Sequence, residues 1–283
     1  EIVPALTAEL EAPETPPAVR LQLARALVSL EAKADELWKQ AQVHGLDMAE
    51  IVEPALASWD YRPAVAVWLS RLENREIDPR RLVLAIEGLE TMKVAEAAPA
   101  LARLAVDRHG APDIRLAAGR ALGEVKHRGL EDDAEALLAR GAPAPMLDRL
   151  IAGLLLRHHS GSRSQELLLR LAADDEPAVQ APPLARLLEI DPMLVEPLNA
   201  QLAGSRDAKV RDLTARLLFG QATPPAVALL GELLDDPHPG VRRFAQESLI
   251  ELAARDALDE PVREAATKML ATDRPRGLEE AAL

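Results

Sequence analysis

The sequence predicts an all-α protein, an α-α superhelix of about eight stacked antiparallel helix pairs. Ala, Leu, Arg and Glu dominate the 283 residues, and aromatic residues make up only 2%. This composition favours helices over strands, which prefer β-branched and aromatic residues. Two further observations support the prediction: an amphipathic pattern recurs along the whole chain, and proline occupies the same place in most of its copies.

The recurring pattern is an aliphatic residue followed by Arg, with small or apolar residues four, seven and eight positions later. Ile114, Arg115, Ala118, Ala121 and Leu122 form a clear copy. These offsets lie in one narrow stripe along a helix. Successive copies are roughly 30 residues apart, a period typical of helical repeats. Their first residues are here called anchors. The pattern with Arg begins at Val19, Ile114, Val210 and Val241, and degenerate copies without that Arg begin at Met48, Arg81, Leu147 and Val179.

Proline marks where these helices begin. It stands two residues before six of the eight anchors, and it is favoured in the first turn of a helix, where its missing N–H costs nothing. Nearby Asp78, Asp113 and Asp207 offer capping oxygens and negative charge to the exposed N–H groups. The six prolines are Pro17, Pro79, Pro112, Pro145, Pro177 and Pro239.

Another amphipathic stretch precedes each of these helices, for example Pro63–Leu72 and Pro225–Leu234. Each unit is therefore a helix, a short turn and a second helix, which cannot bury its apolar stripe without neighbours. We expect a single solenoid domain over residues 1–271, closed by a helix at Pro261–Ala271, and a C-terminal tail over residues 272–283.

A helix pair whose second helix reads D-x-x-V-R-x-x-A-x-x-A-L resembles the short HEAT repeat, of the type found in phycobilisome lyases. The resemblance covers essentially the full chain. It implies that the second helices line a concave face, and that the recurring Arg after each anchor bonds to Asp and carbonyl groups between repeats. It does not indicate one function.

Two structural expectations follow from the register. Leu122, Leu155, Leu187, Leu218 and Leu249 close the stripes of their helices and should be among the most buried residues. Pro182 and Pro183 fall in the second turn of the Val179 helix, where proline is costly. We therefore expect that helix to start near Pro182 or to kink.

Charge and residue content exclude several classes of function. The formal net charge is −13, which disfavours nucleic acid and anionic membranes as partners. There is no cysteine, so disulfides and thiolate sites are excluded. No apolar run is long enough to span a membrane. The chain begins at Glu1 within an amphipathic pattern, which indicates a processed or excised chain; the compartment and the oligomeric state are not indicated. The preference for Arg over Lys suggests a bacterial source.

A second Arg recurs six residues after the anchor, at Arg25, Arg120 and Arg216. It should project from the second helices, either into solvent or toward a partner. All Trp and Tyr residues fall within one short segment. We expect Trp38 and Trp68 to pack in the core. Trp59 and Tyr61 lie in a predicted turn and are candidates for an interface.

No catalytic, cofactor or metal site is predicted. His158 and His159 are adjacent on a helix, so their side chains diverge and cannot grip one ion together. Deoxyhypusine hydroxylase, a HEAT enzyme, uses His-Glu dipeptides as metal ligands, and no His here is followed by Glu. HEAT-like DNA glycosylases need a basic cleft, which this acidic chain lacks. Phycobilin lyases share the short repeat and have no compact motif by which to exclude them.

The leading hypothesis is a non-enzymatic protein interaction scaffold that binds a partner protein along its concave groove. Two alternatives remain open. One is a bilin-lyase-like enzyme that handles a ligand, and the other is a structural spacer within a larger multidomain protein. The candidate partner-binding residues are Arg25, Arg120, Arg216, Trp59 and Tyr61.

Overall fold

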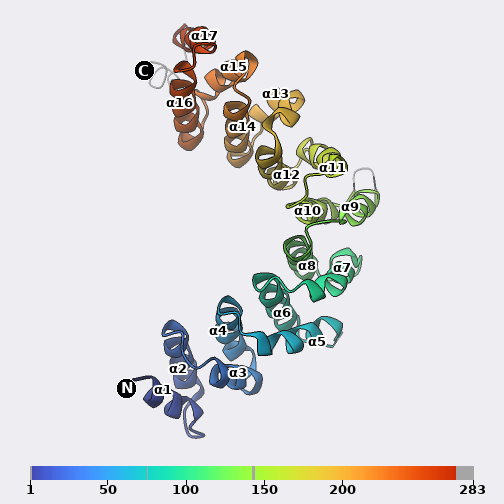
Figure 1. Cartoon of the computed structure of the whole chain (residues 1–283), viewed down its shortest axis with the longest axis vertical. Helices are drawn as coiled ribbons and strands as arrows, with labels where there is room; N and C mark the ends of the chain where they lie inside the picture. Colours follow the sequence, from blue (N-terminus) through green and yellow to red (C-terminus); the bar gives the residue numbers. More distant parts are fainter. Residues whose placement is uncertain (1, 75, 142–143, 272–283) are drawn as a thin grey trace. The chain divides into compact units, whose positions relative to one another are not determined.

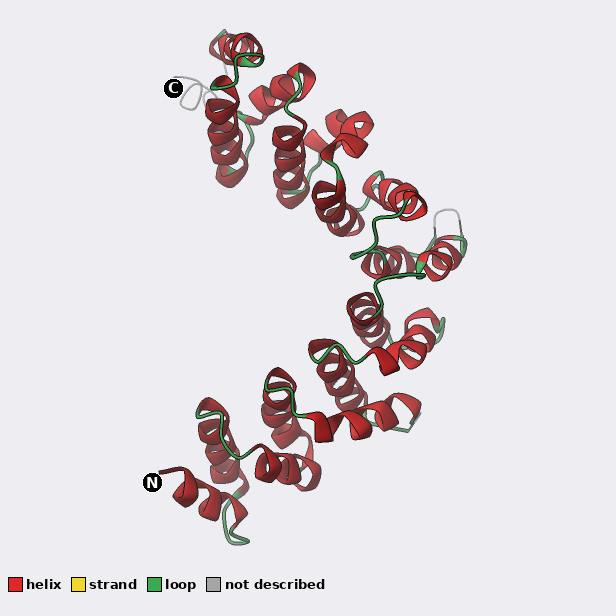
Figure 2. Ribbon diagram, in the orientation of Figure 1, coloured by secondary structure: helices red, strands yellow, loops and turns green. Residues whose placement is uncertain are grey.

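The protein is described by a computed structural model that covers residues 2–74, 76–141 and 144–271. Within these residues it contains seventeen α-helices, three short 3-10 helices and no strand, which confirms the all-α prediction. In chain order the helices form eight pairs followed by α17 (Figures 1 and 2). The α-helices are α1 (Ile2–Glu11), α2 (Pro17–Ser29), α3 (Ala34–Val43), α4 (Gly45–Ser58), α5 (Val65–Glu73), α6 (Pro79–Thr91), α7 (Ala98–Val106), α8 (Pro112–Val125), α9 (Glu131–Leu138), α10 (Met146–Leu155), α11 (Ser162–Ala172), α12 (Pro177–Ile190), α13 (Asn199–Ala203), α14 (Ala208–Gln221), α15 (Pro224–Leu233), α16 (Pro239–Ala253) and α17 (Asp259–Leu270). The 3-10 helices are η1 (Arg62–Ala64), η2 (Ala95–Ala97) and η3 (Pro192–Leu198).

The chain divides into two compact units, Glu1–Asp133 and Ala134–Leu283, here called unit 1 and unit 2. In unit 1 the second helices α2, α4, α6 and α8 pack successively against one another, and the first helices α1, α3, α5 and α7 lie on one side of them (Figure 1). In unit 2 the second helices α10, α12, α14 and α16 pack in the same way. Each unit thus has two helix layers with the core between them.

All eight anchors lie in the second helices of their pairs. Five of the six prolines are the first residue of such a helix, and Pro145 is the N-cap residue of α10. Asp78 accepts a hydrogen bond from the backbone N–H of Arg80, and Asp207 accepts from those of Lys209 and Val210. Capping is therefore present at two of the three predicted positions. Asp113 lies in the first turn of α8, and the N-cap of that helix has no side-chain hydrogen bond.

The five leucines expected at the centre of the stack are buried. Leu122, Leu155, Leu187 and Leu218 are fully inaccessible, and Leu249 is 5% exposed. The predicted register of the second helices is confirmed. The closing helix is also present as α17, whereas the predicted tail at 272–283 lies outside the described residues.

The Arg that follows the anchor bonds to carbonyl groups, as the resemblance implies, but in α2 and α8 these carbonyls belong to the same helix pair and not to a neighbouring repeat. Arg20 is buried, and its Nε and Nη2 donate to the carbonyl oxygens of Leu10 and Ala12, at 3.2 and 2.8 Å. Arg115 donates to the Ala105 carbonyl in the same way. These carbonyls lie at the end of the first helix of the pair, where no intrahelical N–H can reach them. The recurring Arg lies on the second helix, and its side chain donates to the unpaired carbonyls at the end of the first helix.

Unit 2 varies this arrangement. Gln180 takes the place of Arg in α12, and its side-chain amide donates to the Ala172 carbonyl at the end of α11. In α14, Arg211 donates to the Ser205 carbonyl and also forms two hydrogen bonds to Asp236, which precedes the next second helix. Hydrogen bonding to Asp236 raises the pKa of the Arg211 guanidinium above its ordinary value, although burial acts to lower this pKa. This bidentate pair ties the seventh helix pair to the eighth.

The expectation for Pro182 and Pro183 was wrong. α12 runs unbroken from Pro177 to Ile190, although both prolines lack the N–H that would bond to the carbonyl four residues earlier. Packing compensates for this loss. Pro183 is buried, and its ring carbons lie 3.7 Å from the position that a Cβ would take on Gly153 of α10. Because Gly153 has no side chain, the proline ring can pack directly on the neighbouring helix.

Candidate functional site: the second-helix face and the turn grooves

The three candidate arginines project from the second helices α2, α8 and α14, and all are exposed. They lie on the surface of the second helices that is turned away from the first helices, here called the second-helix face. Arg25 and Arg120 belong to unit 1, and Arg216 belongs to unit 2. Each therefore has to be considered in its own surroundings.

Arg120 is held by the preceding second helix. Its Nε donates to both carboxylate oxygens of Glu90 at 3.1 and 3.0 Å, and its Nη2 reaches Glu87 at 3.4 Å. Partial burial lowers the pKa of Arg120, but the hydrogen bonds and charges of the two glutamates outweigh this, so the pKa is raised overall. Arg80 and Glu50 form a similar ion pair between α6 and α4. Arg120 therefore belongs to an ion-pair ladder between successive second helices.

Arg216 takes part in an aromatic cluster. Its guanidinium carbon lies 4.5 Å from the ring centroid of Phe244 on α16, within the range of a cation–π contact. Its Nε also donates to Asp212, one turn earlier on α14, at 2.9 Å. The guanidinium is thus fixed over an aromatic ring that lies on the next second helix.

Phe219 of α14 completes this cluster. Its ring meets that of Phe244 edge to face, with centroids 6.3 Å apart, and Arg255 lies 5.7 Å from its centroid. Both phenylalanines are half-buried, and they are the only two in the chain. Neither phenylalanine was predicted as a site residue, because both lie outside the buried stripes of their helices. Two features of the sequence could have indicated them. Phe is rare in this chain, and Phe244 and Phe219 follow their anchors by three and nine residues.

Those two offsets define the second-helix face of unit 2. The residue three positions after the anchor points toward the preceding second helix, and the residue nine positions after it points away from the core. In unit 2 seven of these eight positions carry apolar residues that remain partly accessible, whereas the eighth, Leu156, is fully buried; the seven are Leu150, Pro182, Leu188, Leu213, Phe219, Phe244 and Ile250. We call this set the apolar rows. In unit 1 the same offsets include Gln22 and Glu90.

Trp59 and Tyr61 lie at the turn between α4 and η1, and both are half-buried against the core of unit 1. The Tyr61 hydroxyl donates to Asp35 at 2.7 Å, and its ring lies 6.3 Å from that of Trp38. Burial and this hydrogen bond raise the pKa of Tyr61 to about 12. Both candidates therefore make internal contacts.

The aromatic packing predicted for Trp38 and Trp68 is present. The two rings meet edge to face at 6.3 Å, and Trp68 is fully buried. The Trp68 Nε1 donates to Glu53 of α4, whose carboxylate is also bound by Arg71 through two hydrogen bonds of 2.6 and 2.9 Å. Gly88 of α6 faces the Trp68 ring, which would lie only 2.8 Å from an added Cβ. This cluster is structural and fixes the third helix pair.

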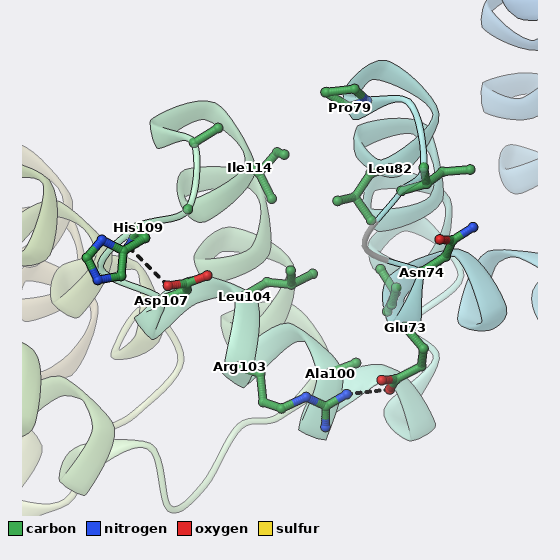
Figure 3. A pocket seen from close by; sticks show the side chains of 14 residues that line it. Glu73, Asn74, Pro79, Leu82, Ala100, Arg103, Leu104, Asp107, His109 and Ile114 are labelled. Carbon is green, nitrogen blue, oxygen red and sulfur yellow. Dashed lines mark hydrogen bonds and ion pairs between the residues drawn. The ribbon is translucent and has the colours of Figure 1, made fainter.

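Unit 1 contains a groove of about 610 Å³. Figure 3 shows the side chains that line it. The groove lies where the ends of α5 and α7 meet the starts of α6 and α8. Its wall is mainly apolar, with Leu82, Leu104 and Ile114, and two of the charged side chains that line it are paired with each other. Arg103 is ion-paired with Glu73, and the backbone N–H of His109 donates to Asp107 at 3.0 Å.

Unit 2 contains a groove of about 710 Å³ at the equivalent place, between the turns that precede α14 and α16. Ser205 and Asp236 line it, and they occupy turn positions like those of Asn74 and Asp107 in the first groove. Both grooves lie between the turns of successive pairs and recur with the repeat. A smaller cavity of about 280 Å³ lies on the second-helix face of unit 1 beside Arg120.

None of the described helices combines the length and the apolar character needed to cross a membrane. No family model matches the chain, and no curated protein matches its sequence.

Comparison with solved structures defines the class of the fold. A chain of the complex in which Kap95p binds RanGDP aligns over 99% of this chain and 40% of that chain, with a TM-score of 0.57 and 15% identity. The structural neighbours are HEAT-repeat-like helical solenoids, and the protein has this fold. The chain spans less than half the length of that neighbour.

Two other similar structures are a human deoxyhypusine hydroxylase in complex with glycerol and the CpcE–CpcF complex of phycocyanin lyase from Nostoc sp. PCC7120. The first has 18% identity and a TM-score of 0.38, and covers 90% of this chain and 96% of that chain. The second has 17% identity and a TM-score of 0.37, and covers 94% of this chain and 92% of that chain. Scores this low support no conclusion about function.

Proposed function

We propose that the protein is a non-enzymatic scaffold that holds a partner protein against the second-helix face of unit 2. The observation that carries the proposal is the cluster of Phe219, Phe244, Arg216 and Arg255. The two phenylalanines are the only ones in the sequence, and their rings contact each other. The residues three and nine positions after the other anchors have smaller side chains.

The chemistry of this surface suits a protein partner. Aromatic and Arg side chains supply a large share of the binding energy in protein interfaces, especially where they cluster. Here the arginines lie over the rings, so both are held in place before a partner arrives. Preorganised side chains lose less entropy on binding. The apolar rows extend the cluster across four second helices, which gives room for an extended or helical segment of the partner.

The grooves favour a scaffold over a ligand-handling enzyme. A ligand site needs a concave pocket with convergent polar groups. The groove of Figure 3 has a suitable volume, but its Arg103 and Glu73 neutralise each other, and unit 2 repeats the groove at the equivalent turns. Nucleic acid is disfavoured as the partner by the net charge of −13.

The test is quantitative affinity capture with the whole chain as bait in an extract of its source organism. The double variant Phe219→Ser, Phe244→Ser should reduce recovery of the specific partner at least about tenfold, which corresponds to roughly 1.4 kcal/mol of binding free energy. The control is Val43→Ser, which removes an apolar side chain of 74% exposure at the end of α3. It should leave recovery unchanged.

Circular dichroism must first show that both variants remain folded. Recovery of every partner in undiminished amount by the double variant would contradict the proposal. Tight binding of the bait to duplex DNA at physiological salt would contradict the preference for a protein.

A further inference from the structure

The stacking stripe of α2, the first of the second helices, is partly exposed. In each of the seven later second helices the residue four positions after the anchor is buried: Val52, Ala85, Ala118, Ile151, Pro183, Thr214 and Ala245. In α2 this residue is Leu23, and it is only half-buried. The anchor of α2 is also more exposed than later valine anchors, since Val19 is 43% exposed while Val210 and Val241 are fully inaccessible.

The later helices show what covers this stripe. Pro183 of α12 packs on Gly153 of α10, so the residue four positions after the anchor faces the preceding second helix. α2 precedes all other second helices, and among the described residues its main helix contacts are with α1 and α4. The stripe continues to Leu30, which is 49% exposed.

The exposed stripe has the spacing of a helix–helix seam. Val19, Leu23, Ala26 and Leu30 are separated by four, three and four residues. This alternation is the one by which two helices interlock side chains along a shared seam. It also alternates in size, because the small Ala26 follows the large Leu23 and precedes the large Leu30.

We propose that α2 pairs with α2 of a second copy of this chain, in antiparallel orientation about a two-fold axis that passes between residues 24 and 25. Val19 then meets the second copy's Leu30, and Leu23 meets its Ala26, so each bulky side chain faces a residue it can pack against. The contact continues the stacking of second helices that already holds unit 1 together. A two-fold contact is closed, so it gives a dimer and not a filament.

Charge supports the same occupant. The chain contains 46 acidic residues, and its formal net charge is −13. Two copies therefore repel each other over most of their surfaces. α2 is the only second helix without Asp or Glu within its bounds, Pro17–Ser29. Its exposed charge is Arg25, which the helical period places about 130° away from the stripe. Two copies can therefore approach through α2 without bringing carboxylates of the two seams together.

The first experiment measures self-association of the chain by sedimentation equilibrium over a range of concentrations. We expect a reversible dimer, and the exposed-site variants Val19→Glu and Leu30→Glu should each raise its Kd at least about tenfold. The matched control is Leu270→Glu, which places the same charge on a 50% exposed apolar site of α17 and should leave the Kd unchanged. A chain that stays monomeric at all concentrations, or that grows into open-ended assemblies, would overturn the proposal.

The second experiment tests the register by disulfide cross-linking. The sequence contains no cysteine, so only the introduced cysteines can form a disulfide. A mixture of Val19→Cys and Leu30→Cys chains should form a disulfide-linked dimer of one chain of each kind. Val19→Cys alone should not, because its two copies would lie roughly 16 Å apart along the helix axis, beyond the reach of a disulfide. Efficient cross-linking of Val19→Cys alone, or none in the mixture, would rule out the antiparallel seam.

Discussion

The buried arginines show how a single side chain can explain a sequence repeat. The last carbonyls of a helix have no intrahelical donor, and leaving them unpaired inside a protein is costly. Arg20 and Arg115 reach these carbonyls from the next helix, and their positive charge also lies at the negative end of the first helix. Gln180 keeps the hydrogen bond without the charge. The recurring feature is therefore a donor at this position.

Tyr61 supplies a prediction at the same scale. Its pKa of about 12 lies above the ordinary value of 10.0, because burial and the hydrogen bond to Asp35 favour the neutral phenol. The stability that Tyr61 contributes is therefore complete below pH 10 and is lost as the pH rises through about 12. Tyr61 is the chain's only tyrosine, so an ultraviolet absorbance titration reports on it alone.

We expect the native chain to ionise Tyr61 near pH 12 and the chain in denaturant near pH 10. The variant Asp35→Asn removes the charge that opposes ionisation, so its native titration should shift toward 10, whereas Asp113→Asn should titrate like the unmodified protein. Circular dichroism at each pH shows whether the fold persists. Native titration near 10 in the folded, unmodified protein would show that Tyr61 does not hold this contact in solution.

At the scale of the helix, α12 shows how packing can override local preference. Proline in a helix interior loses a hydrogen bond and crowds the carbonyl four residues earlier. Pro183 compensates for this by packing on Gly153, while Pro182 is only half-buried. The two adjacent prolines therefore differ in what the fold gains from them.

This difference predicts the effect of replacing each proline. Pro182→Ala restores an N–H that can bond to the Ala178 carbonyl, so it should raise the free energy of unfolding by about 1–2 kcal/mol. Pro183→Ala restores an N–H too but loses the contact with Gly153, so its gain should be smaller. Pro112→Ala is the control, because proline suits the first turn of α8 and its loss should cost a few tenths of a kcal/mol. Urea unfolding measures all three, and a larger gain for Pro183→Ala would contradict this account.

The same contrast explains how much could be predicted from the sequence. The helix starts, the anchors and the buried leucines could be predicted, because they depend on local rules for proline, Asp and periodicity. The continuity of α12 could not, because it depends on a glycine 30 residues earlier whose role is visible only in the packed pair. The cluster of Phe219 and Phe244 was missed because its members lie outside the buried stripe and come from different repeats.

At the scale of the whole molecule, the stack has a consequence for stability. Each helix pair contacts mainly its neighbours in the chain, so stability is shared between adjacent pairs and not across the whole array. Leu122 in unit 1 and Leu218 in unit 2 occupy the same position in their repeats, and both are fully buried. They make a matched pair for testing how far a local defect spreads.

Leu218→Ala and Leu122→Ala should each cost about 2–5 kcal/mol locally, because each leaves a cavity in a close-packed stripe. Amide hydrogen exchange followed by mass spectrometry should show faster exchange in α12, α14 and α16 for Leu218→Ala, with α4 and α6 unchanged. Leu122→Ala should show the reverse, with faster exchange in α6 and α8 and unchanged α14 and α16. If either variant instead accelerated exchange equally in all helices, the chain would unfold as one cooperative body, and nearest-neighbour stacking would not describe its stability.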